Sequence, residues 1–477
     1  MLLLSNNQSM KTIRIGNAAG FWGDSPSAPR QLVQNGQLDY LTLEYLAELT
    51  LSILAHQKRK NPTLGFVTEV PTVVSEIASH FSADQNLKLV TNGGGMNPSD
   101  CAKAVAQVLN DDRELHLGET LIATSCGDDI LPRLDELIAA GEPFSNIETG
   151  DAISSIRDRI ASANVYLGSD GICDSLAGGA RIVLTGRVAD ASLIVGPAVH
   201  EFGWGRDDYA RLAKATVAGH LIECGAQATG GIYSDWNPET SLGDIGYPIA
   251  VMSESGDCEI TKPDGTGGEV SVSTCSEQLI YEIGDPKRYM TPDVIADFSQ
   301  VKFEQSSQHA VSVSGGTGMS RPDQLKVSIA YYDGFIASGM IVVAGRHAAQ
   351  KATAAAQAIQ RKLLSDGIEL DDFNIEVLGM GDSAPGMRSK LLENSVPENV
   401  PWEVVLRVTG RSQNRNHTDR MLRELAPLVT SGPPGVTGYT GARGKSMPVL
   451  SFWPALISRE HVWPEVEIRS AVDWLTK

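Results

Sequence analysis

The residues best able to do chemistry follow apolar segments of the chain. Asp128 and Asp129 are adjacent in "SCGDDIL", and Arg187 precedes Asp190 by three positions in "LTGRVADASL". A buried carboxylate can act as a general base, and a guanidinium can clamp a carboxylate or phosphate through paired hydrogen bonds. The structural alternatives are that one aspartate caps the following helix and that Arg187 pairs with Asp190 to brace its turn. We favour a cap for one of the adjacent aspartates and a catalytic role for the other.

A third candidate group lies in "GHLIECGAQATGG", residues 219–231. On a helix, His220, Glu223 and Cys224 share one face, because residues three and four apart are neighbours there. They suit an acid–base pair or a nucleophile with its base, and Gln227 and Thr229 are candidate substrate-binding residues. The alternative is a core histidine beside a buried cysteine. No second histidine stands at ligand spacing, so we predict no metal site.

The stretch "KLVTNGGGMNPSD", residues 88–100, raises the question of a phosphate site. It has a strand, glycines and a helix start, but neither the GxGxxG nor the GxxxxGK[ST] spacing of nucleotide loops. The alternative is a strand-to-helix turn that requires positive φ. We predict that it lines a substrate pocket together with neighbouring residues of the next such loop. The predicted substrate-binding residues here are Asn92, Gly93, Gly94, Gly95 and Thr185.

Near the C-terminus, "SGPPGVTGYTGARGK" (431–445) is glycine-rich and locally basic. Its composition makes it a candidate anion-facing lid, with Arg443 as a substrate-binding residue. A surface linker between a helix and a strand fits the same composition, and the sequence does not separate the two readings.

These candidates need an alternation of strands and helices to position them. Strand-like "TIRIGN", "LDYLTLEYL", "LKLVTNGGG" and "ARIVLTGRVAD" alternate with helical segments, which predicts an α/β fold with a layered, mostly parallel sheet and flanking helices. The expected domains are 11–345, with a loop- and β-rich elaboration at 231–325, and 346–477. The second domain follows a β-α-β-β-α-β order, its first strand starting as early as 325, which predicts a smaller ferredoxin-like α+β domain.

The composition narrows the classes of function. The 477-residue chain has 39 Lys and Arg against 58 Asp and Glu, a net charge of −19, which disfavours nucleic-acid and membrane-surface binding. Six cysteines without a CxxC pair indicate free thiols in a reducing compartment. No apolar run approaches the ~20 residues of a membrane span, and we expect no signal peptide at the start, which has no charged n-region. We expect a cytoplasmic protein.

Several blocks in this order resemble the acyclic terpene utilisation (AtuA) family. They include "GFWGDSPSAP", "VTNGGGMNP", "GDDIL", "LTGRVADASL", "GHLIECGAQATGG" and "QLIYEIGDPKRYMTPDV". The likeness covers roughly residues 11 to 345, with more in "PGVTGYTGARG" and "FWPALISREHV". The resemblance implies a place in the bacterial catabolism of branched isoprenoid acids as coenzyme A thioesters. It supplies no catalytic residues, so the residues above rest on the sequence alone.

The sequence and the resemblance together predict an enzyme acting on a branched or isoprenoid carboxylic acid or its acyl-CoA thioester. The chemistry would be of the hydratase or lyase type. The cofactor is left open, with coenzyme A a candidate as part of the substrate and no metal or nicotinamide motif in the sequence. The competing hypothesis is a non-catalytic partner or assembly subunit of an acyl-CoA carboxylase or dehydrogenase pathway. An oxidoreductase ranks third, because no dinucleotide fingerprint fits. A homo-oligomer with a small-molecule substrate is expected.

Overall fold

The computed structural model describes residues 11–237, 241–384, 386–387, 401–439 and 444–476. They form two compact units: unit 1 holds the residues up to 330 together with 452–477, and unit 2 holds residues 331–451. The chain passes into unit 2 within β14 (Gln324–Ala344) and returns within β18 (Met447–Ser458). The units do not divide between residues 345 and 346, where the sequence predicts a domain boundary. Whether the two predicted domains fold independently stays a prediction.

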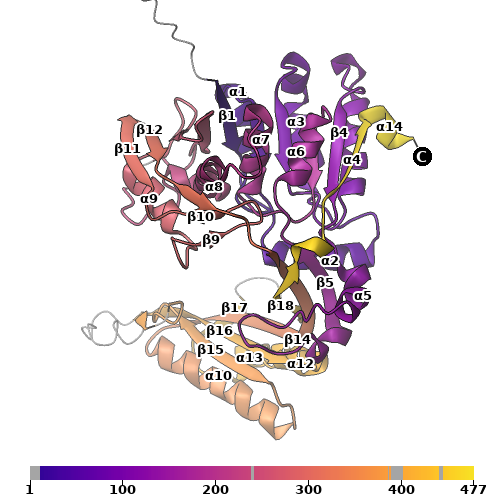
Figure 1. Cartoon of the computed structure of the whole chain (residues 1–477). Helices are drawn as coiled ribbons and strands as arrows, with labels where there is room; N and C mark the ends of the chain where they lie inside the picture. Colours follow the sequence, from indigo (N-terminus) through magenta and orange to yellow (C-terminus); the bar gives the residue numbers. More distant parts are fainter. Residues whose placement is uncertain (1–10, 238–240, 385, 388–400, 440–443, 477) are drawn as a thin grey trace, which may run out of the picture. The chain divides into compact units, whose positions relative to one another are not determined.

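Unit 1 is built on a ten-stranded sheet (Figure 1). The five central strands are parallel and have the order β1 (Thr12–Asn17), β2 (Tyr40–Leu43), β3 (Lys88–Thr91), β6 (Ile182–Thr185) and β4 (Leu121–Cys126). Antiparallel strands flank them: β7 (Ile249–Ser253), β8 (Cys258–Thr261), β12 (Ala310–Ser314) and β11 (Lys302–Ser307) beyond β1, and β19 (Glu465–Ser470) beyond β4. The α/β prediction is confirmed, but the sheet is mixed, and a mostly parallel sheet is not confirmed.

The helices of unit 1 follow from the strand order. The chain advances from β1 to β4 through α1 (Ala28–Asn35), α3 (Glu69–Ala83) and α4 (Pro98–Asp111), and then turns back to β6 through α6 (Asp170–Ala177). Crossovers between parallel strands are right-handed, so the reversal moves the later helices to the other face of the sheet. The later helices are α7 (Ser192–Phe202) and α8 (Tyr209–Glu223). The contacts agree: α3 packs on α1 and α4, and α7 packs on α6 and α8.

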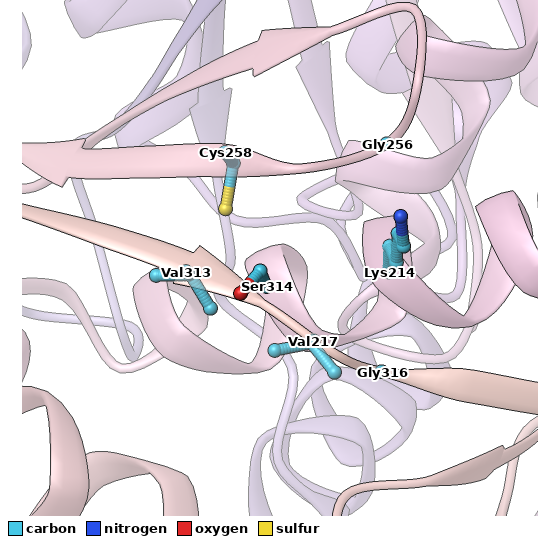
Figure 2. Close-up of a pocket in the computed structure, with 7 residues that line it drawn as sticks. All are labelled: Lys214, Val217, Gly256, Cys258, Val313, Ser314 and Gly316. Carbon is cyan, nitrogen blue, oxygen red and sulfur yellow. The ribbon is translucent and has the colours of Figure 1, made fainter. Parts of the chain in front are cut away.

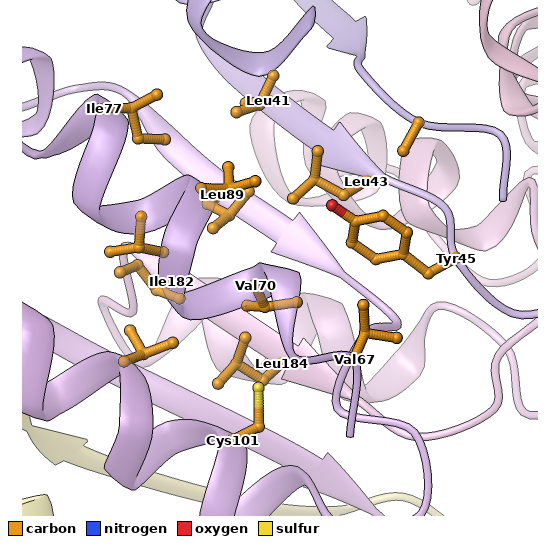
Figure 3. Packing of buried hydrophobic residues seen from close by; sticks show 14 of the residues in the cluster. Leu41, Leu43, Tyr45, Val67, Val70, Ile77, Leu89, Cys101, Ile182 and Leu184 are labelled. Atoms are coloured by element: carbon orange, nitrogen blue, oxygen red, sulfur yellow. The ribbon is translucent and has the colours of Figure 1, made fainter. Parts of the chain in front are cut away.

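One hydrophobic core joins the first helical layer to the sheet (Figure 3). Leu41, Leu89 and Ile182 are register partners on three neighbouring strands, and all three are buried on this face. Side chains alternate between the faces of a strand, so this row points toward α3 and α4, where Ile77 and Cys101 pack. The short strands are fully buried, as expected where both faces carry helices.

Smaller elements complete unit 1. Three strands form a separate sheet: β9 (Tyr289–Met290), β10 (Ile295–Asp297) and β13 (Thr317–Met319). The remaining elements are α2 (Glu48–Lys60), α5 (Leu134–Ala139), β5 (Ile160–Val165), α9 (Val272–Ile280) and α14 (Ala471–Leu475). The predicted elaboration at 231–325 therefore contributes the antiparallel strands beyond β1 and the small sheet.

Unit 2 is an α+β unit. Its strands have the order β15 (Asp372–Leu378), β16 (Glu403–Ser412), β14 and β17 (Val436–Tyr439), with antiparallel pairing throughout. The helices in its described residues are α10 (Ala348–Ser365), α12 (Arg415–Arg423) and α13 (Leu428–Ser431). Alanines of α10, such as Ala352 and Ala356, are buried against β16, because small side chains let the helix approach the sheet closely. The ferredoxin-like assignment of this unit is not confirmed and stays a prediction.

None of the helices in the described part of the chain is both long enough and apolar enough to cross a bilayer.

Candidate functional site

The candidate site lies where two neighbouring parallel strands send their chains to opposite faces of the sheet. After β3 the chain enters α4 in the first helical layer, and after the adjacent β6 it enters α7 in the second. Open α/β sheets bind ligands in the crevice that such a switch point leaves at the carboxyl ends of the strands. The two loops at this point are 92–97, with the three glycines, and 186–191, with Arg187 and Asp190.

The triple-glycine turn is a close-packed junction between β3 and β6. A Cβ on Gly94 would lie 2.6 Å from the carbonyl oxygen of Thr185, and one on Gly93 would lie 2.5 Å from Val70. Gly95 has φ +54°, in the left-handed region. The N–H of Gly93 donates to the Thr91 hydroxyl (3.0 Å) and that of Gly95 to the Asn92 carbonyl (3.0 Å). The N–H groups of residues 96 and 97 also bind carbonyls, so packing accounts for this turn and few donors remain for an anion.

Arg187 is buried at the centre of the switch point, with 2 % of its surface exposed. Its Nη2 pairs with Asp190 Oδ1 at 2.8 Å, and its Nη1 donates to the Leu46 carbonyl and lies 3.8 Å from Glu44 Oε1. The guanidinium stacks on the Tyr166 ring at 4.0 Å. Burial alone would lower the pKa of Arg187, but the charges of Asp190 and its other acidic neighbours together outweigh burial and raise the pKa. The predicted bracing pair is present, and Nε is buried without a partner among the described residues.

Glu44, directly after β2, is the buried carboxyl group facing Arg187. Its Oε1 accepts hydrogen bonds from Asn92 Nδ2 (2.7 Å) and the Leu46 N–H (2.9 Å). Asn92 Oδ1 accepts in turn from the Tyr45 N–H (2.8 Å), so Asn92 connects the ends of β2 and β3. Burial, reinforced by the charge of Asp190, raises the pKa of Glu44 to about 8 despite the opposing effect of Arg187. This shift favours the protonated form of Glu44 near neutral pH.

A second carboxylate and a lysine extend the cluster through Tyr166. The Tyr166 hydroxyl donates to Glu48 Oε1 at 2.5 Å, and Lys326 Nζ lies 3.1 Å from the same oxygen. Burial opposes ionisation of Glu48, but the Tyr166 hydrogen bond and the Lys326 charge lower its pKa to about 2. Glu48 is thus a permanent anion at physiological pH, unlike Glu44, and it fixes the ring on which Arg187 stacks.

The C-terminal end of α8 comes to the same edge of the sheet. Asn17, the last residue of β1, donates through Nδ2 to the carbonyls of Ile222 (2.8 Å) and Glu223 (3.0 Å). One turn earlier, a Cβ on Gly219 would lie 2.8 Å from Ala191, the neighbour of Asp190 in sequence. These contacts bring the buried pair His220–Glu223 beside the loop that carries Arg187 and Asp190.

His220 and Glu223 are hydrogen-bonded to each other, as their spacing suggested. His220 Nδ1 lies 3.0 Å from Glu223 Oε1, and His220 Nε2 lies 3.2 Å from the Leu279 carbonyl. Burial raises the pKa of Glu223 although the His220 charge opposes it, and the Glu223 charge raises the pKa of His220 although burial opposes it. Cys224 follows the pair, and burial raises the pKa of its thiol, so a thiolate nucleophile is disfavoured at neutral pH.

Asp128 and Asp129 both bind backbone, but at different places. Asp128 Oδ2 accepts from the Arg187 N–H (2.9 Å) and from Asn164 Nδ2 (2.7 Å), so it holds the turn that presents Arg187. Asp129 Oδ1 accepts from the Leu131 N–H (3.1 Å) at the start of a short 3-10 helix. Burial raises the pKa of Asp128 to about 6, partly offset by these hydrogen bonds.

The other predicted residues contribute less to the cluster. The Thr185 hydroxyl is buried and donates to the Gly186 carbonyl (2.9 Å). Thr229 is buried and donates to the Ala226 carbonyl (3.0 Å), and Gln227 lies in the same 3-10 helix, Gly225–Thr229. Arg443 lies outside the described residues, as does part of the predicted lid at 431–445.

The sequence reasoning overlooked Glu44, Glu48 and Tyr166. The pattern "LDYLTLEYL" places Glu44 within a predicted strand. Glu44 is nevertheless the first acidic residue after the buried β2, and a carboxylate directly after an apolar strand is the same signal that singled out Asp128. Glu48 begins α2. An acidic residue in the first turn of a helix is expected to stabilise the helix, so its type and position do not indicate a site. No local signal marks Tyr166, because its role depends on the tertiary stacking with Arg187.

The structure also has a small hollow, shown in Figure 2, that no residue of this cluster lines. It is lined by Lys214, Val217, Gly256, Cys258, Val313, Ser314 and Gly316, and its empty volume is about 170 Å³, open solvent included. Ligand pockets usually measure ~300–1,000 Å³. Lys214 pairs with Asp257 at 2.9 Å, so we do not assign a site there. Among the described residues, no group of three or more His, Cys, Asp or Glu is arranged to hold a metal ion.

Unit 1 is therefore an α/β unit whose central parallel strands end at a buried cluster of carboxyl, guanidinium and imidazole groups. Open α/β sheets bind their ligands at such a switch point, at the carboxyl ends of the strands. The chain belongs to the AtuA family: the family model described as acyclic terpene utilisation family protein AtuA matches residues 13–468. This match confirms the resemblance seen in the sequence. No curated protein and no solved structure matches the chain.

Proposed function

We propose that the protein is a catabolic enzyme that acts on a branched or isoprenoid carboxylic acid or its acyl-CoA thioester by acid–base chemistry of the hydratase or lyase type. The family's description, which refers to the utilisation of acyclic terpenes, supports the substrate class. The observation that carries the chemistry is Glu44, a buried carboxyl group with a pKa of about 8, held beside Arg187 at the switch point.

Glu44 suits the role of general acid. Adding water to a conjugated double bond, or removing it, requires one group that donates a proton and another that accepts one. A carboxyl group that stays protonated at neutral pH can donate, and its pKa near the working pH favours transfer in both directions. The Glu44 oxygen already fixed by Asn92 and Leu46 is Oε1, which leaves Oε2 as the donor.

Arg187 supplies a fixed positive charge beside the reacting atoms. Its terminal nitrogens are occupied by Asp190, Leu46 and Glu44, so a free carboxylate clamp is not available without rearrangement. The buried Nε is the remaining donor for an acyl oxygen. A charge that is already in place before the reaction stabilises negative charge that develops on the acyl group.

The wider assignments accompany this proposal. The antiparallel order β15-β16-β14-β17, with α10 and α12 between strands, supports a ferredoxin-like arrangement for unit 2. The net charge of −19 supports a small-molecule substrate rather than nucleic acid or a membrane surface. We propose a cytoplasmic homo-oligomer, with coenzyme A present only as part of the substrate.

The test combines binding and exchange. The full chain is screened by thermal shift against branched and linear enoyl-CoA thioesters and the free acids, because a ligand stabilises the native state by mass action. Compounds that bind are then incubated in heavy water, and deuterium incorporation next to the acyl group is followed by mass spectrometry. We expect binding and exchange for at least one branched thioester or acid.

Glu44→Gln is the decisive variant, with Glu304→Gln on an exposed strand position as the matched control. We expect a loss of exchange of roughly 100-fold or more in Glu44→Gln, with thermal shift retained, since general acid catalysis contributes ~10²–10⁴-fold. Unchanged exchange in a folded Glu44→Gln would remove Glu44 as the acid. A screen without any binding or exchange would reject the enzyme and favour the assembly-subunit alternative.

A further inference from the structure

The hydrogen bonds of His220 limit where its protons can lie. Nε2 lies 3.2 Å from the Leu279 carbonyl oxygen, and a carbonyl oxygen only accepts, so Nε2 carries a hydrogen. Nδ1 lies 3.0 Å from Glu223 Oε1, and a hydrogen bond there requires one further proton between the two atoms. The charge of Glu223 raises the pKa of His220 against burial and favours that proton on Nδ1, whereas burial raises the pKa of Glu223 and favours the proton on Oε1.

Both ring nitrogens of His220 are thus engaged, and its ring is enclosed. The side chain is 2 % exposed, and the rings of Tyr289 and Phe298 each pack at 5.5 Å between centroids. A ligand could reach His220 only by breaking one of its two hydrogen bonds. Glu223 differs, because its Oε2 is buried and has no hydrogen-bond partner among the described residues.

Glu223 also lies at the edge of the sheet where the candidate site is, at the carboxyl ends of the parallel strands. Asn17, at the end of β1, holds the backbone of Glu223 at the carboxyl ends of the parallel strands. The close approach of Gly219 to Ala191 places this turn of α8 beside Asp190. The negative charge of Asp190 adds to the effect of burial in raising the pKa of Glu223, which agrees with this proximity.

We infer that Glu223 is the proton-accepting catalytic residue of the site and that His220 is a positioning residue that keeps Glu223 ionised and oriented. This inference rests on the proposed function and supplies the base that complements Glu44 as the acid. In the step, Glu223 Oε2 forms a bond to a proton of water or of a ligand C–H group, and the electron pair of the broken bond stays on that oxygen or carbon. Oε1 keeps its hydrogen bond from His220 throughout.

Other titratable groups face the pair and enter its pH dependence. They are Asp190 after β6, Glu282 after α9, Cys224 at the end of α8 and Tyr289 on β9. Burial disfavours the ionised form of Glu223 most, and the acidic Asp190 and Glu282 add to this effect. His220 opposes them and lowers the pKa of Glu223, so we expect the removal of His220 to raise that pKa.

The test compares Glu223→Gln, His220→Gln and the control His461→Gln, which affects the separate pair of His461 and Glu142, 3.4 Å apart. With a substrate that exchanges deuterium, we expect a loss of roughly 100-fold or more in kcat for Glu223→Gln. His220→Gln should lose less. Its acid limb of kcat/KM should move to higher pH, because the carboxylate loses the cation that lowers its pKa. Equal losses in the two variants without a shifted limb, or an active Glu223→Gln, would overturn the inference.

A second readout does not depend on turnover. Nitrogen NMR of the full chain with labelled histidine, assigned through His220→Gln, reports the protonation of both ring nitrogens. We expect both nitrogens of His220 to be protonated at neutral pH, and Nδ1 to lose its proton in Glu223→Gln. A neutral His220 in the unmodified protein would overturn the inference even if catalysis is found. Protonated nitrogens together with no turnover of any probe would instead count against the proposed function.

Discussion

Glu44 Oε1 lies 3.8 Å from Arg187 Nη1, whereas Asp190 Oδ1 lies only 2.8 Å from Nη2 of the same guanidinium. Asp190 therefore makes the direct ion pair, and its side chain is still 36 % exposed. Glu44 is buried and must share a cation that is already paired, so burial dominates and raises its pKa. Burial also raises the pKa of Asp190, although Arg187 opposes this effect, so one arginine holds two carboxyl groups whose ionisation burial disfavours.

Glu44→Gln should remove a pH dependence of stability. The pKa of Glu44 is 4.5 in an unfolded chain and about 8 when folded, so the folded state retains the proton between these values. Stability of the unmodified protein should fall as pH rises through this window, by up to ~1.4 kcal/mol per pH unit. The variant should lack this component. Urea denaturation at about pH 5, 7 and 9 measures it, and parallel curves for both proteins would contradict the raised pKa.

Arg187→Ala should be strongly destabilising, by about 3–5 kcal/mol, because it leaves buried carboxyl groups without their cation. Arg187→Lys keeps the charge but loses the paired geometry and the stacking on Tyr166, so an intermediate loss is expected. Denaturant midpoints measure both. Arg206→Ala is the control: Arg206 pairs with Asp170 at 3.3 Å but is 67 % exposed, and a change within ~0.5 kcal/mol is expected. Similar losses at the two arginines would contradict the buried cluster.

Gly94→Ala should destabilise the junction of β3 and β6. Its Cβ would lie 2.6 Å from a backbone oxygen, which cannot move aside as a flexible side chain can. Overpacking of this kind costs about 1–3 kcal/mol. Gly284→Ala is the matched control, because its Cβ would have no neighbour within 4 Å and its φ is not positive. A neutral Gly94→Ala in thermal and urea denaturation would show that the turn is loosely packed.

Asp128→Ala should weaken the turn that presents Arg187. It removes the acceptor of two buried hydrogen bonds and leaves both donors unpaired, at a cost of about 1–3 kcal/mol. Asp128→Asn keeps an oxygen at this position and should lose less. The pKa of Asp128 is 3.8 unfolded and about 6 folded, so the unmodified protein should also lose stability as pH rises between these values. Chemical denaturation of the three proteins at several pH values measures both effects.

Local pattern in the sequence was enough to predict the alternating elements of unit 1. Segments such as "TIRIGN" and "KLVT" carry their strand character in a few consecutive apolar residues, and polar loops follow them. The same local rule selected Arg187, Asp190 and the His220–Glu223 pair, because their partners lie within one helical turn. The AtuA family assignment also came from the sequence and is confirmed.

The tertiary structure decided which loops meet. The position of β6 between β3 and β4 brings the glycine turn to Thr185, and the pairing of β2 with β3 brings Glu44 to Asn92 and Arg187. Strand order depends on burying both faces of one sheet at once, and no single segment contains that information. The pKa of Glu44 has the same origin, because a carboxyl group acquires it only when distant segments remove water and hold it beside Arg187.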